Sequence, residues 1–267
     1  MVAAIIVTYH PDIQRLIKNI HAIIDYVDKL IIWRNSNDDV SELTSISSKI
    51  LVCGNGSNKF LSEPYNRALK WCKKNGYKYL LTMDQDSLWD NLEGFLQTVS
   101  ISEASDIAIY SPNMNKVELS CDILVDKEFV ISSGSLINID IALKIGGFNE
   151  KYKIYWVDSE FCFRARANGY KIVMLPNYNI AHELGKQTKT LFGYTTSNYS
   201  PIVYYYMMRN MLWEHREHGN DAVSIKCVIY TTYYNLRGII LGEKDKCHKI
   251  AMIVKGWMNG LFSSYKS

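Results

Sequence analysis

The stretch AAIIVTYHPDIQRLIKNIHAII, residues 3–24, decides the fold class of this chain. Its first six residues form an Ile- and Val-rich run that is typical of a parallel strand covered on both faces. Apolar residues then recur every three or four positions, which predicts a helix with one buried face. A second apolar run at residues 30–33 predicts another strand, so the chain opens with a β-α-β unit.

The alternation of apolar runs and helical spacing continues to about residue 200. Further strands are expected over Ile50–Cys53, Tyr79–Met83 and Ile107–Ser111, near Leu124, and over Phe129–Ser133 and Lys171–Leu175. Further helices are expected over Pro64–Lys73, Leu92–Ile101, Ile139–Ile145 and Asp158–Asn168. This order predicts an α/β fold with a Rossmann-like, mostly parallel sheet flanked by helices, which binds ligands beyond the carboxyl ends of its strands. From residue 201 the chain is rich in Tyr, Met and Trp at helical spacing, so we expect an α/β domain over residues 1–200 and a helical region over residues 201–267.

The composition excludes several classes of protein. With 267 residues, 48% of them hydrophobic and 21% charged, the chain is expected to fold around a sizeable core. Its 30 basic and 27 acidic residues give a net charge of +3, too small to indicate a nucleic-acid partner. The six cysteines form no CxxC pair, the first residues have no basic secretory leader, and no apolar stretch reaches the ~20 residues of a membrane span. We therefore expect a cytoplasmic protein.

Two carboxylates follow the strand expected over residues 79–83, in the sequence Asp84-Gln85-Asp86-Ser87. Carboxylates in this position suit Mg²⁺ or Mn²⁺, which bind through one or two of them plus the phosphates of a substrate. The alternative is an ordinary helix cap, since Asp86 and Ser87 precede a helix. A single D-x-D pattern does not decide between the two.

A second group of polar and aromatic residues lies further along the chain, where Asp158 and Glu160 open an expected helix beside Trp156. A carboxylate among aromatic residues is partly desolvated, which raises its basicity, so Asp158 is a candidate general base. Glu160 also fits an ion pair with an arginine four residues later in the helix. His182 lies in a loop, where it is either a hydrogen-bonded packing residue or a further ligand of a metal bound by Asp86.

Several short motifs in a fixed order carry a resemblance to a known family: VTYHP (7–11), NS (35–36), DQDS (84–87), GGFNE (146–150), VDSEFCFRA (157–165), HELG (182–185) and YYYMMRN (204–210). Together they resemble the family 2 glycosyltransferases of GT-A fold. Within that family the chain looks most like the rhamnosyltransferase-type members of bacterial polysaccharide and O-antigen assembly. The resemblance covers about residues 3–213 and implies a GT-A domain with a helical appendage.

The resemblance also implies roles for individual residues. It assigns nucleotide contacts to Thr8, Tyr9, Arg34, Asn35, Asn66, Arg67 and Asp84, and it assigns the binding of Mn²⁺ or Mg²⁺ to Asp86 and His182. It makes Asp158 the catalytic base and puts Trp156, Glu160 and Arg209 at the sugar or acceptor pocket. Where the family usually has an aspartate before Asn35, this chain has Arg34, which is either a surface residue or a cation that pairs with a phosphate or alters recognition of the base. The nucleotide therefore stays open.

The implied reaction is the metal-dependent, inverting transfer of a sugar from a nucleotide-diphosphate sugar to a hydroxyl of a lipid-linked or growing glycan in cell-surface polysaccharide assembly. Rhamnose from dTDP-rhamnose is the first candidate, while UDP-galactose and UDP-N-acetylhexosamines stay open as donors. A catalytically inactive sugar-nucleotide-binding or scaffold protein of the same fold is the alternative; Arg34 mildly favours it, and the joint presence of Asp86, Asp158 and His182 argues against it. A nucleotidyltransferase is disfavoured because no Gly-rich, basic loop follows the first strand.

Aromatic residues interleaved with Lys and Arg mark the region after residue 200. This composition suits the headgroup region of an anionic membrane, so peripheral attachment to the inner face of the cytoplasmic membrane is one hypothesis. A helical packing or homodimerisation module that buries the aromatic side chains is the other. The sequence leaves both open.

Overall fold

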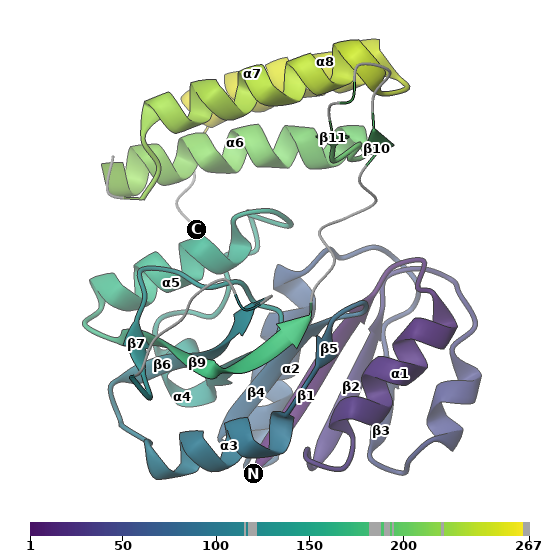
Figure 1. Ribbon diagram of the computed structural model, residues 1–267, viewed down its shortest axis with the longest axis vertical. Helices are drawn as coiled ribbons and strands as arrows, with labels where there is room; N and C mark the ends of the chain where they lie inside the picture. Colours follow the sequence, from purple (N-terminus) through teal and green to yellow (C-terminus); the bar gives the residue numbers. More distant parts are fainter. Residues whose placement is uncertain are drawn as a thin grey trace. The chain divides into compact units, whose positions relative to one another are not determined.

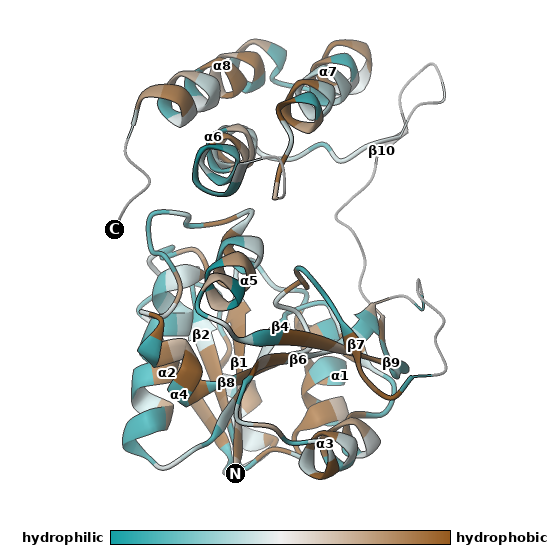
Figure 2. Ribbon diagram, turned by 90° about the vertical axis from the view of Figure 1, so that its left-hand side faces the viewer, coloured by the Kyte–Doolittle hydropathy of each residue, from teal (hydrophilic) through white to brown (hydrophobic). Residues whose placement is uncertain are grey.

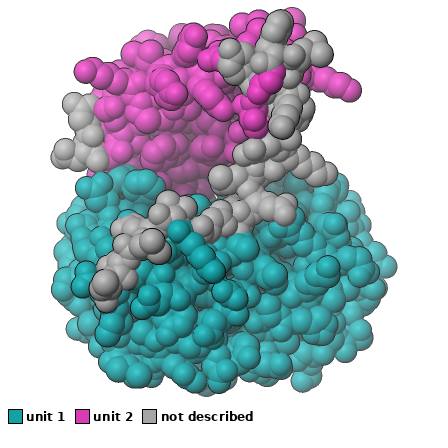
Figure 3. Space-filling view, viewed as in Figure 1, with its two compact units in different colours: residues 1–149, 161–183 teal, residues 150–160, 184–267 magenta. Residues whose placement is uncertain are grey.

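The computed structural model describes residues 1–114, 116, 122–181, 188–189, 193, 195–219 and 222–263. The chain forms two compact units, which Figure 3 shows in different colours. Unit 1 comprises residues 1–149 and 161–183, and unit 2 comprises residues 150–160 and 184–267. The sequence places the division near residue 200, so unit 2 takes in two segments that lie before that point.

The strands of unit 1 form one mixed sheet in the order β3-β2-β1-β4-β8-β6-β9-β5, with β7 also paired to β9. Their bounds are β1 Val2–Thr8, β2 Lys29–Arg34, β3 Ile50–Cys53, β4 Tyr79–Asp84, β5 Leu88–Trp89, β6 Ile107–Met114, β7 Val125–Asp126, β8 Ser135–Asn138 and β9 Lys171–Ala181. The helices are α1 Ile13–Ile23, α2 Ser62–Lys74, α3 Leu92–Ile101, α4 Ile139–Lys144 and α5 Val157–Ala167, with a short 3-10 helix η1 Ser41–Ser45. The first turn of α5 belongs to unit 2 and the rest of it to unit 1.

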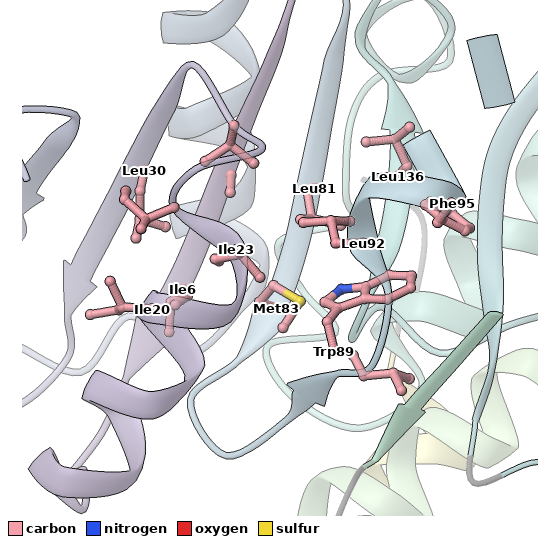
Figure 4. Close-up of a cluster of buried hydrophobic side chains, with 14 of the residues drawn as sticks. Ile6, Ile20, Ile23, Leu30, Leu81, Met83, Trp89, Leu92, Phe95 and Leu136 are labelled. Atoms are coloured by element: carbon pink, nitrogen blue, oxygen red, sulfur yellow. The ribbon is translucent and has the colours of Figure 1, made fainter. Parts of the chain in front are cut away.

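The parallel part of the sheet is the part that the sequence predicts best. β3, β2, β1 and β4 run parallel and each is an apolar run; β1 and β4 are buried almost throughout, whereas the edge strand β3 is mostly half-buried. Figures 1 and 2 show α1 and α3 on one face and α2 and α4 on the other. Ile20 and Ile23 of α1 lie in one buried cluster with Leu81 and Met83 of β4 (Figure 4). Because burying each such side chain contributes about 1.5–3 kcal/mol, this packing fixes where the strand ends lie.

The other part of the sheet mixes directions; one expected strand is absent there and another is longer than expected. β8 runs antiparallel to β4 and β6, whereas β6 and β9 are parallel. Residues 129–133 form no strand, because β8 occupies the edge of β4 and follows them only after Gly134, whose φ is +78°. β9 continues past Leu175 to Ala181, since it resumes its pairing with β6 after an irregular step.

Unit 2 consists mainly of three helices, as the sequence predicts for the region after residue 200. These are α6 Pro201–His218, α7 Ile225–Gly242 and α8 Lys246–Phe262, with a short hairpin of β10 Thr188–Lys189 and β11 Thr195–Thr196. α8 approaches α6 closely at Gly256 and Gly260, where an added Cβ would lie 2.6 Å from the Tyr205 carbonyl oxygen and 2.7 Å from the Leu212 Cβ. In the ranges described, no helix is long and apolar enough to cross a membrane.

A buried ionic cluster joins the turn between α7 and α8 to α6. Glu243 is 4% exposed and accepts hydrogen bonds from the Tyr204 hydroxyl at 2.8 Å and the Lys249 ammonium at 2.7 Å. Thr196 donates to the same carboxylate, and Lys249 also donates to Asn198 Oδ1 at 2.8 Å. Each buried charge has partners that offset its loss of water, so the cluster tolerates burial only while it stays complete.

Candidate active site

The first group of predicted site residues lies at the carboxyl ends of β1, β2 and β4. The register pairs Thr8 with Arg34 and Val7 with Asp84, so these strand ends adjoin one another at one edge of the sheet. Thr8 is buried, whereas Arg34 and Asp84 are half-buried. The sheet therefore brings together residues that stand far apart in the sequence, at the edge where parallel sheets bind ligands.

The side chain of Gln85 joins two of these strand ends. Its Oε1 accepts the Tyr9 backbone N–H at 2.8 Å, and its Nε2 donates to the Tyr9 carbonyl at 3.2 Å. The next backbone N–H, of His10, donates to Ser36 Oγ at 2.9 Å, after the end of β2. In the triplet Asp84-Gln85-Asp86, the middle residue therefore has a structural role. The two flanking residues supply the carboxylates.

The backbone of this acidic loop is fixed from two sides. From α1, Asn19 Nδ2 donates to the Asp84 carbonyl at 2.8 Å, and Arg15 Nη2 donates to the Asp86 carbonyl at 2.7 Å. From the segment before β8, Ser133 Oγ accepts the Asp84 N–H at 3.1 Å. Because the loop is held before any ligand binds, its half-buried carboxylates need little rearrangement to act on one.

A cavity of about 540 Å³ opens beside the acidic loop within unit 1. Ser133, which holds Asp84, also lines this cavity. Much of the remaining wall is apolar and includes Phe129, Ile131 and Met174. The cavity is large enough for a sugar ring and is lined by apolar side chains together with a few polar ones, as small-molecule sites usually are.

Two residues that are predicted to contact the nucleotide form hydrogen bonds within unit 1. Asn35 is 3% exposed; its Nδ2 donates to the Phe60 carbonyl at 2.7 Å, and its Oδ1 accepts the Lys59 N–H at 3.0 Å. Asn66 is 8% exposed, and its amide bonds both the N–H and the carbonyl of Phe148, at 2.7 and 2.8 Å. These amides hold loops in place, and their direct contact with a nucleotide stays a prediction.

Two cationic side chains lie near the end of β2. The guanidinium carbon of Arg67 lies 5.6 Å from the centroid of the Trp33 ring, and Arg67 pairs with Glu63 at 2.8 Å. Arg34 directly follows Trp33, and its Nε is buried with no hydrogen-bond partner among the described residues. A buried donor without a partner is costly, so Arg34 is a candidate to bind an anion or a carbonyl oxygen.

Backbone strain marks the segment that leads into α5. Lys153, Tyr155 and Trp156 have φ values of 60°, 65° and 65°, in the left-handed region that residues with side chains rarely adopt. Such a residue costs about 1–3 kcal/mol and persists only where its surroundings enforce it. Asp158 follows two residues later, in the first turn of α5, so this segment determines where Asp158 lies.

The side chain of Asn210, in α6, holds this strained segment. Its Nδ2 lies 2.9, 3.0 and 2.6 Å from the carbonyl oxygens of Tyr152, Ile154 and Tyr155. Asn210 is fully buried, so water does not compete for these bonds. One amide therefore fixes the path of the chain over the residues with left-handed backbone.

Arg209 belongs to the same support. Its Nε and Nη2 donate to Asn210 Oδ1 at 2.9 and 2.7 Å, and Nη2 also donates to the Lys151 carbonyl. Its guanidinium carbon lies 3.9 Å from the ring centroid of Trp213 and 4.6 Å from that of Tyr206. Burial lowers the pKa of Arg209, yet a guanidinium stays charged at neutral pH. These contacts orient Asn210, and the predicted contact of Arg209 with sugar or acceptor stays a prediction.

Unit 2 brings three further predicted residues together at the start of α5. Asp158 is half-buried and Glu160 is 2% exposed, so Asp158 is the more accessible carboxylate. Burial, then Tyr199, and then the charge of Asp158 raise the pKa of Tyr155. Trp156 packs against the core of unit 2, and its indole Nε1 is buried with no hydrogen-bond partner among the described residues.

Asp84 and Asp86 are the carboxylates that could hold a divalent cation. Among the residues described, no group of three or more His, Cys, Asp or Glu side chains is arranged to hold a metal ion. Two carboxylates nevertheless fit Mg²⁺ or Mn²⁺ when the phosphates of a substrate supply further ligands. The other predicted ligand, His182, lies outside the described residues.

Comparison with known proteins shows which fold the chain has and which protein it is similar to. No family model matches the chain. The chain is 24% identical over 285 residues to the dTDP-rhamnosyl transferase RfbF of Shigella flexneri, covering 97% of this chain and 94% of that protein. The solved mannosyltransferase PcManGT of Pyrobaculum calidifontis, in complex with GDP-Man and Mn²⁺, has a TM-score of 0.63 at 11% identity, covering 98% of this chain and 75% of that one. This chain has the GT-A fold of these glycosyltransferases.

Two further solved glycosyltransferases share the fold. GalNAc-T7 with UDP, GalNAc and Mn²⁺ has a TM-score of 0.61 at 10% identity; 98% of the present chain is covered, but it spans only 56% of that structure. S. aureus TarS with UDP-GlcNAc has a TM-score of 0.56 at 14% identity, covering 98% of the present chain and 72% of that one. At these identities the likeness concerns the fold alone.

Sequence reasoning missed the residues that support the candidate site. Arg15, Asn19 and Ser133 act on backbone atoms of the acidic loop, a role that leaves no pattern in one sequence. Gln85 could have been found, because it stands between the two candidate carboxylates. Asn210 ends the motif YYYMMRN, but only the structure links it to the segment before Asp158.

Proposed function

We propose that the chain transfers a sugar from a nucleotide-diphosphate sugar to an acceptor hydroxyl, with inversion at the anomeric carbon. The bond from the anomeric carbon to the acceptor oxygen forms as the bond to the leaving diphosphate breaks, and the hydroxyl proton passes to Asp158. The observation that carries this proposal is the convergence of Thr8, Arg34 and Asp84 at one sheet edge, in a chain similar over nearly its whole length to a sugar transferase.

The first candidate donor is dTDP-rhamnose, in keeping with the similarity to the Shigella flexneri protein. The apolar cavity wall with Phe129, Ile131 and Met174 suits the methyl group of a 6-deoxy sugar, because burying an apolar group there removes it from water. UDP-galactose and UDP-N-acetylhexosamines are the alternative donors, since solved neighbours of the same fold carry UDP-GlcNAc or GDP-Man. Arg34 would bind the nucleotide through its unpartnered Nε.

Asp84 and Asp86, with His182 by resemblance, would hold Mn²⁺ or Mg²⁺ at the acidic loop. A bound divalent cation neutralises the charge that develops on the leaving diphosphate. The chain contributes a loop whose backbone is already fixed by hydrogen bonds from α1 and from the segment before β8. Groups held in place before the reaction stabilise developing charge without reorganising.

Asp158 would act as the general base. A hydroxyl is a poor nucleophile at neutral pH, and a positioned base that accepts its proton typically raises the rate about 10²–10⁴-fold. Inversion follows when base and leaving group lie on opposite faces of the sugar ring. Asn210 and Arg209 would act as positioning residues, because they hold the strained segment from which Asp158 follows. Trp156 and Glu160 would line the sugar or acceptor pocket.

The proposed acceptor is a hydroxyl of a lipid-linked or growing glycan in the assembly of a cell-surface polysaccharide. An acceptor of this class is held at a membrane, so we propose that the enzyme works at the inner face of the cytoplasmic membrane.

Ligand-induced thermal stabilisation tests the donor assignment, because a ligand that binds only the folded state raises its melting temperature. The panel comprises dTDP-rhamnose, UDP-galactose, UDP-GlcNAc, UDP-GalNAc and GDP-mannose, each with and without Mn²⁺. We expect a Mn²⁺-dependent rise with dTDP-rhamnose that is lost in Asp86→Asn and retained in the control Asp106→Asn, whose carboxylate pairs with Lys171. A folded protein that responds to no donor contradicts the proposal and favours a scaffold role.

A further inference from the structure

Several large apolar side chains on the last two helices are exposed to solvent. Tyr230 and Tyr233 of α7 are 67% and 62% exposed, and Met258 and Phe262 of α8 are 52% and 76% exposed. We call their surroundings the α7–α8 face, which comprises Lys226, Ile229, Tyr230, Tyr233, Ile240, Val254, Lys255, Met258, Leu261 and Phe262. All these residues are exposed.

The exposed residues follow the period of a helix, so they form faces and are not scattered. Along α7, Lys226, Tyr230 and Tyr233 are exposed at spacings of four and three residues, whereas Val228, Asn235 and Ile239, at spacings of seven and four, are buried. α8 repeats the pattern, with its buried positions Ile253, Gly256 and Gly260 interleaved with exposed ones. Each helix therefore has one face in the core of unit 2 and one face left uncovered.

The two uncovered faces lie on one side of unit 2. Both helices contact α6 and each other, and Figure 2 shows α7 and α8 side by side on the same side of α6. The glycines at 256 and 260 face α6, which turns the opposite face of α8 outward. The exposed side chains of both helices thus belong to one broad surface.

The charge on this surface has one sign. Neither α7 nor α8 contains Asp or Glu, and the charged residues of the α7–α8 face are the exposed Lys226 and Lys255. The exposed carboxylate of Asp245 lies in the turn between the two helices, where it pairs with His248. Lys249 does not count toward this charge, because it is buried against Glu243. Tyr and Phe side chains with lysines between them and no carboxylates match the interface of a bilayer that carries anionic lipid.

We propose that the α7–α8 face docks the enzyme on the surface of an anionic lipid bilayer. The aromatic and aliphatic side chains enter the headgroup region, and the lysines pair with lipid phosphates. A second copy of the chain fits this face less well, since a two-fold contact would bring the lysines of both copies together without carboxylates to meet them. The docking is independent of the sugar transferred and is measured without substrate, so its failure is distinguishable from failure of the proposed reaction.

The test is flotation of the full chain with vesicles at 0.15 M NaCl. We expect binding to phosphatidylcholine vesicles that contain 30% phosphatidylglycerol, and at least tenfold weaker binding to phosphatidylcholine alone. Lys226→Gln and Lys255→Gln should each weaken binding about fivefold. Tyr230→Ser with Tyr233→Ser should weaken it at least tenfold, and the matched control Ile101→Ser with Ile123→Ser, at exposed positions of unit 1, should leave it unchanged.

Several results would overturn this inference. They are no binding to either vesicle, equal binding to both, or equal losses in the tyrosine and control variants. Light scattering distinguishes the rival occupant: a dimer in solution that the tyrosine substitutions dissociate, together with no flotation, would assign the face to a second copy. Because the lysine variants keep the apolar surface, they test the proposal even if the tyrosine variants fold poorly.

Discussion

Replacing Asn210 with alanine should slow catalysis far more than it weakens donor binding. The change removes the donor to the carbonyls of Tyr152, Ile154 and Tyr155 and the acceptor for Arg209, all in the interior of unit 2. At about 1 kcal/mol net for each of roughly three hydrogen bonds, the free energy of unfolding should fall by about 3 kcal/mol. That loss lowers Tm by about 6–12 °C.

The effect on the reaction follows from the strained backbone that Asn210 holds. Without the amide, Lys153, Tyr155 and Trp156 can leave their left-handed conformations, and Asp158 moves with them. A shift of about 1 Å in a catalytic group can cost about 10² in rate, so kcat should fall about 100-fold. The KM for the donor should change less than threefold, because the predicted nucleotide contacts belong to unit 1.

Asn235→Ala is the matched control for this prediction. Asn235 is also a buried asparagine of unit 2, and its Nδ2 donates to the Thr231 carbonyl at 2.8 Å, away from the segment before α5. It should lower Tm while keeping kcat, as measured by steady-state transfer together with thermal unfolding. If Asn210→Ala kept kcat, or if both variants lost kcat alike, the positioning role of Asn210 would be refuted.

Three further predictions concern other parts of the chain. Arg34→Met should raise the donor Kd about tenfold in titration calorimetry with little change in kcat, and an unchanged Kd would remove Arg34 from the nucleotide site. Lys249→Met should lower the free energy of unfolding by about 3–5 kcal/mol in urea because it strands buried Glu243, and Glu243→Gln in addition should restore part of that loss; equal stabilities would contradict the role of the pair. Burial raises the pKa of Cys72 to about 12, so its thiol stays protonated at pH 8 and should resist alkylation, whereas exposed Cys227 should react. Mass spectrometry of the alkylated native protein checks this, and modification of Cys72 as fast as Cys227 would contradict it.

The parallel part of the fold follows from the sequence because its signals are local. The strand that ends at Thr8 and the one that ends at Asp84 are apolar runs, and parallel pairing then forces their ends to one edge. Residues 129–133 begin with a similar apolar run but form no strand. A run becomes a strand only where a neighbouring strand has an unpaired edge, and one sequence does not reveal this. The sequence therefore predicts the parallel half of the sheet correctly and the mixed half only in part.

The candidate site divides in the same way. Asp86 and Asp158 could be proposed because each directly follows or opens an element that the sequence predicts. The role of Asn210 in holding the segment before Asp158 could not be predicted from the sequence. Asn210 lies more than fifty residues further along the chain, and it bonds backbone oxygens, which any residue would offer. Backbone strain such as that at Trp156 likewise has no signature in residue type.

The most direct test of the account is to compare donor binding and sugar transfer in the wild-type chain and in Asp158→Asn. The variant keeps the size of the side chain but removes the base. We predict that the donor Kd stays within threefold of wild type while transfer slows by about 10²–10⁴, the usual contribution of a general base. Transfer within tenfold of wild type, with donor binding intact, would contradict the assignment of Asp158 as the base and with it the proposed mechanism.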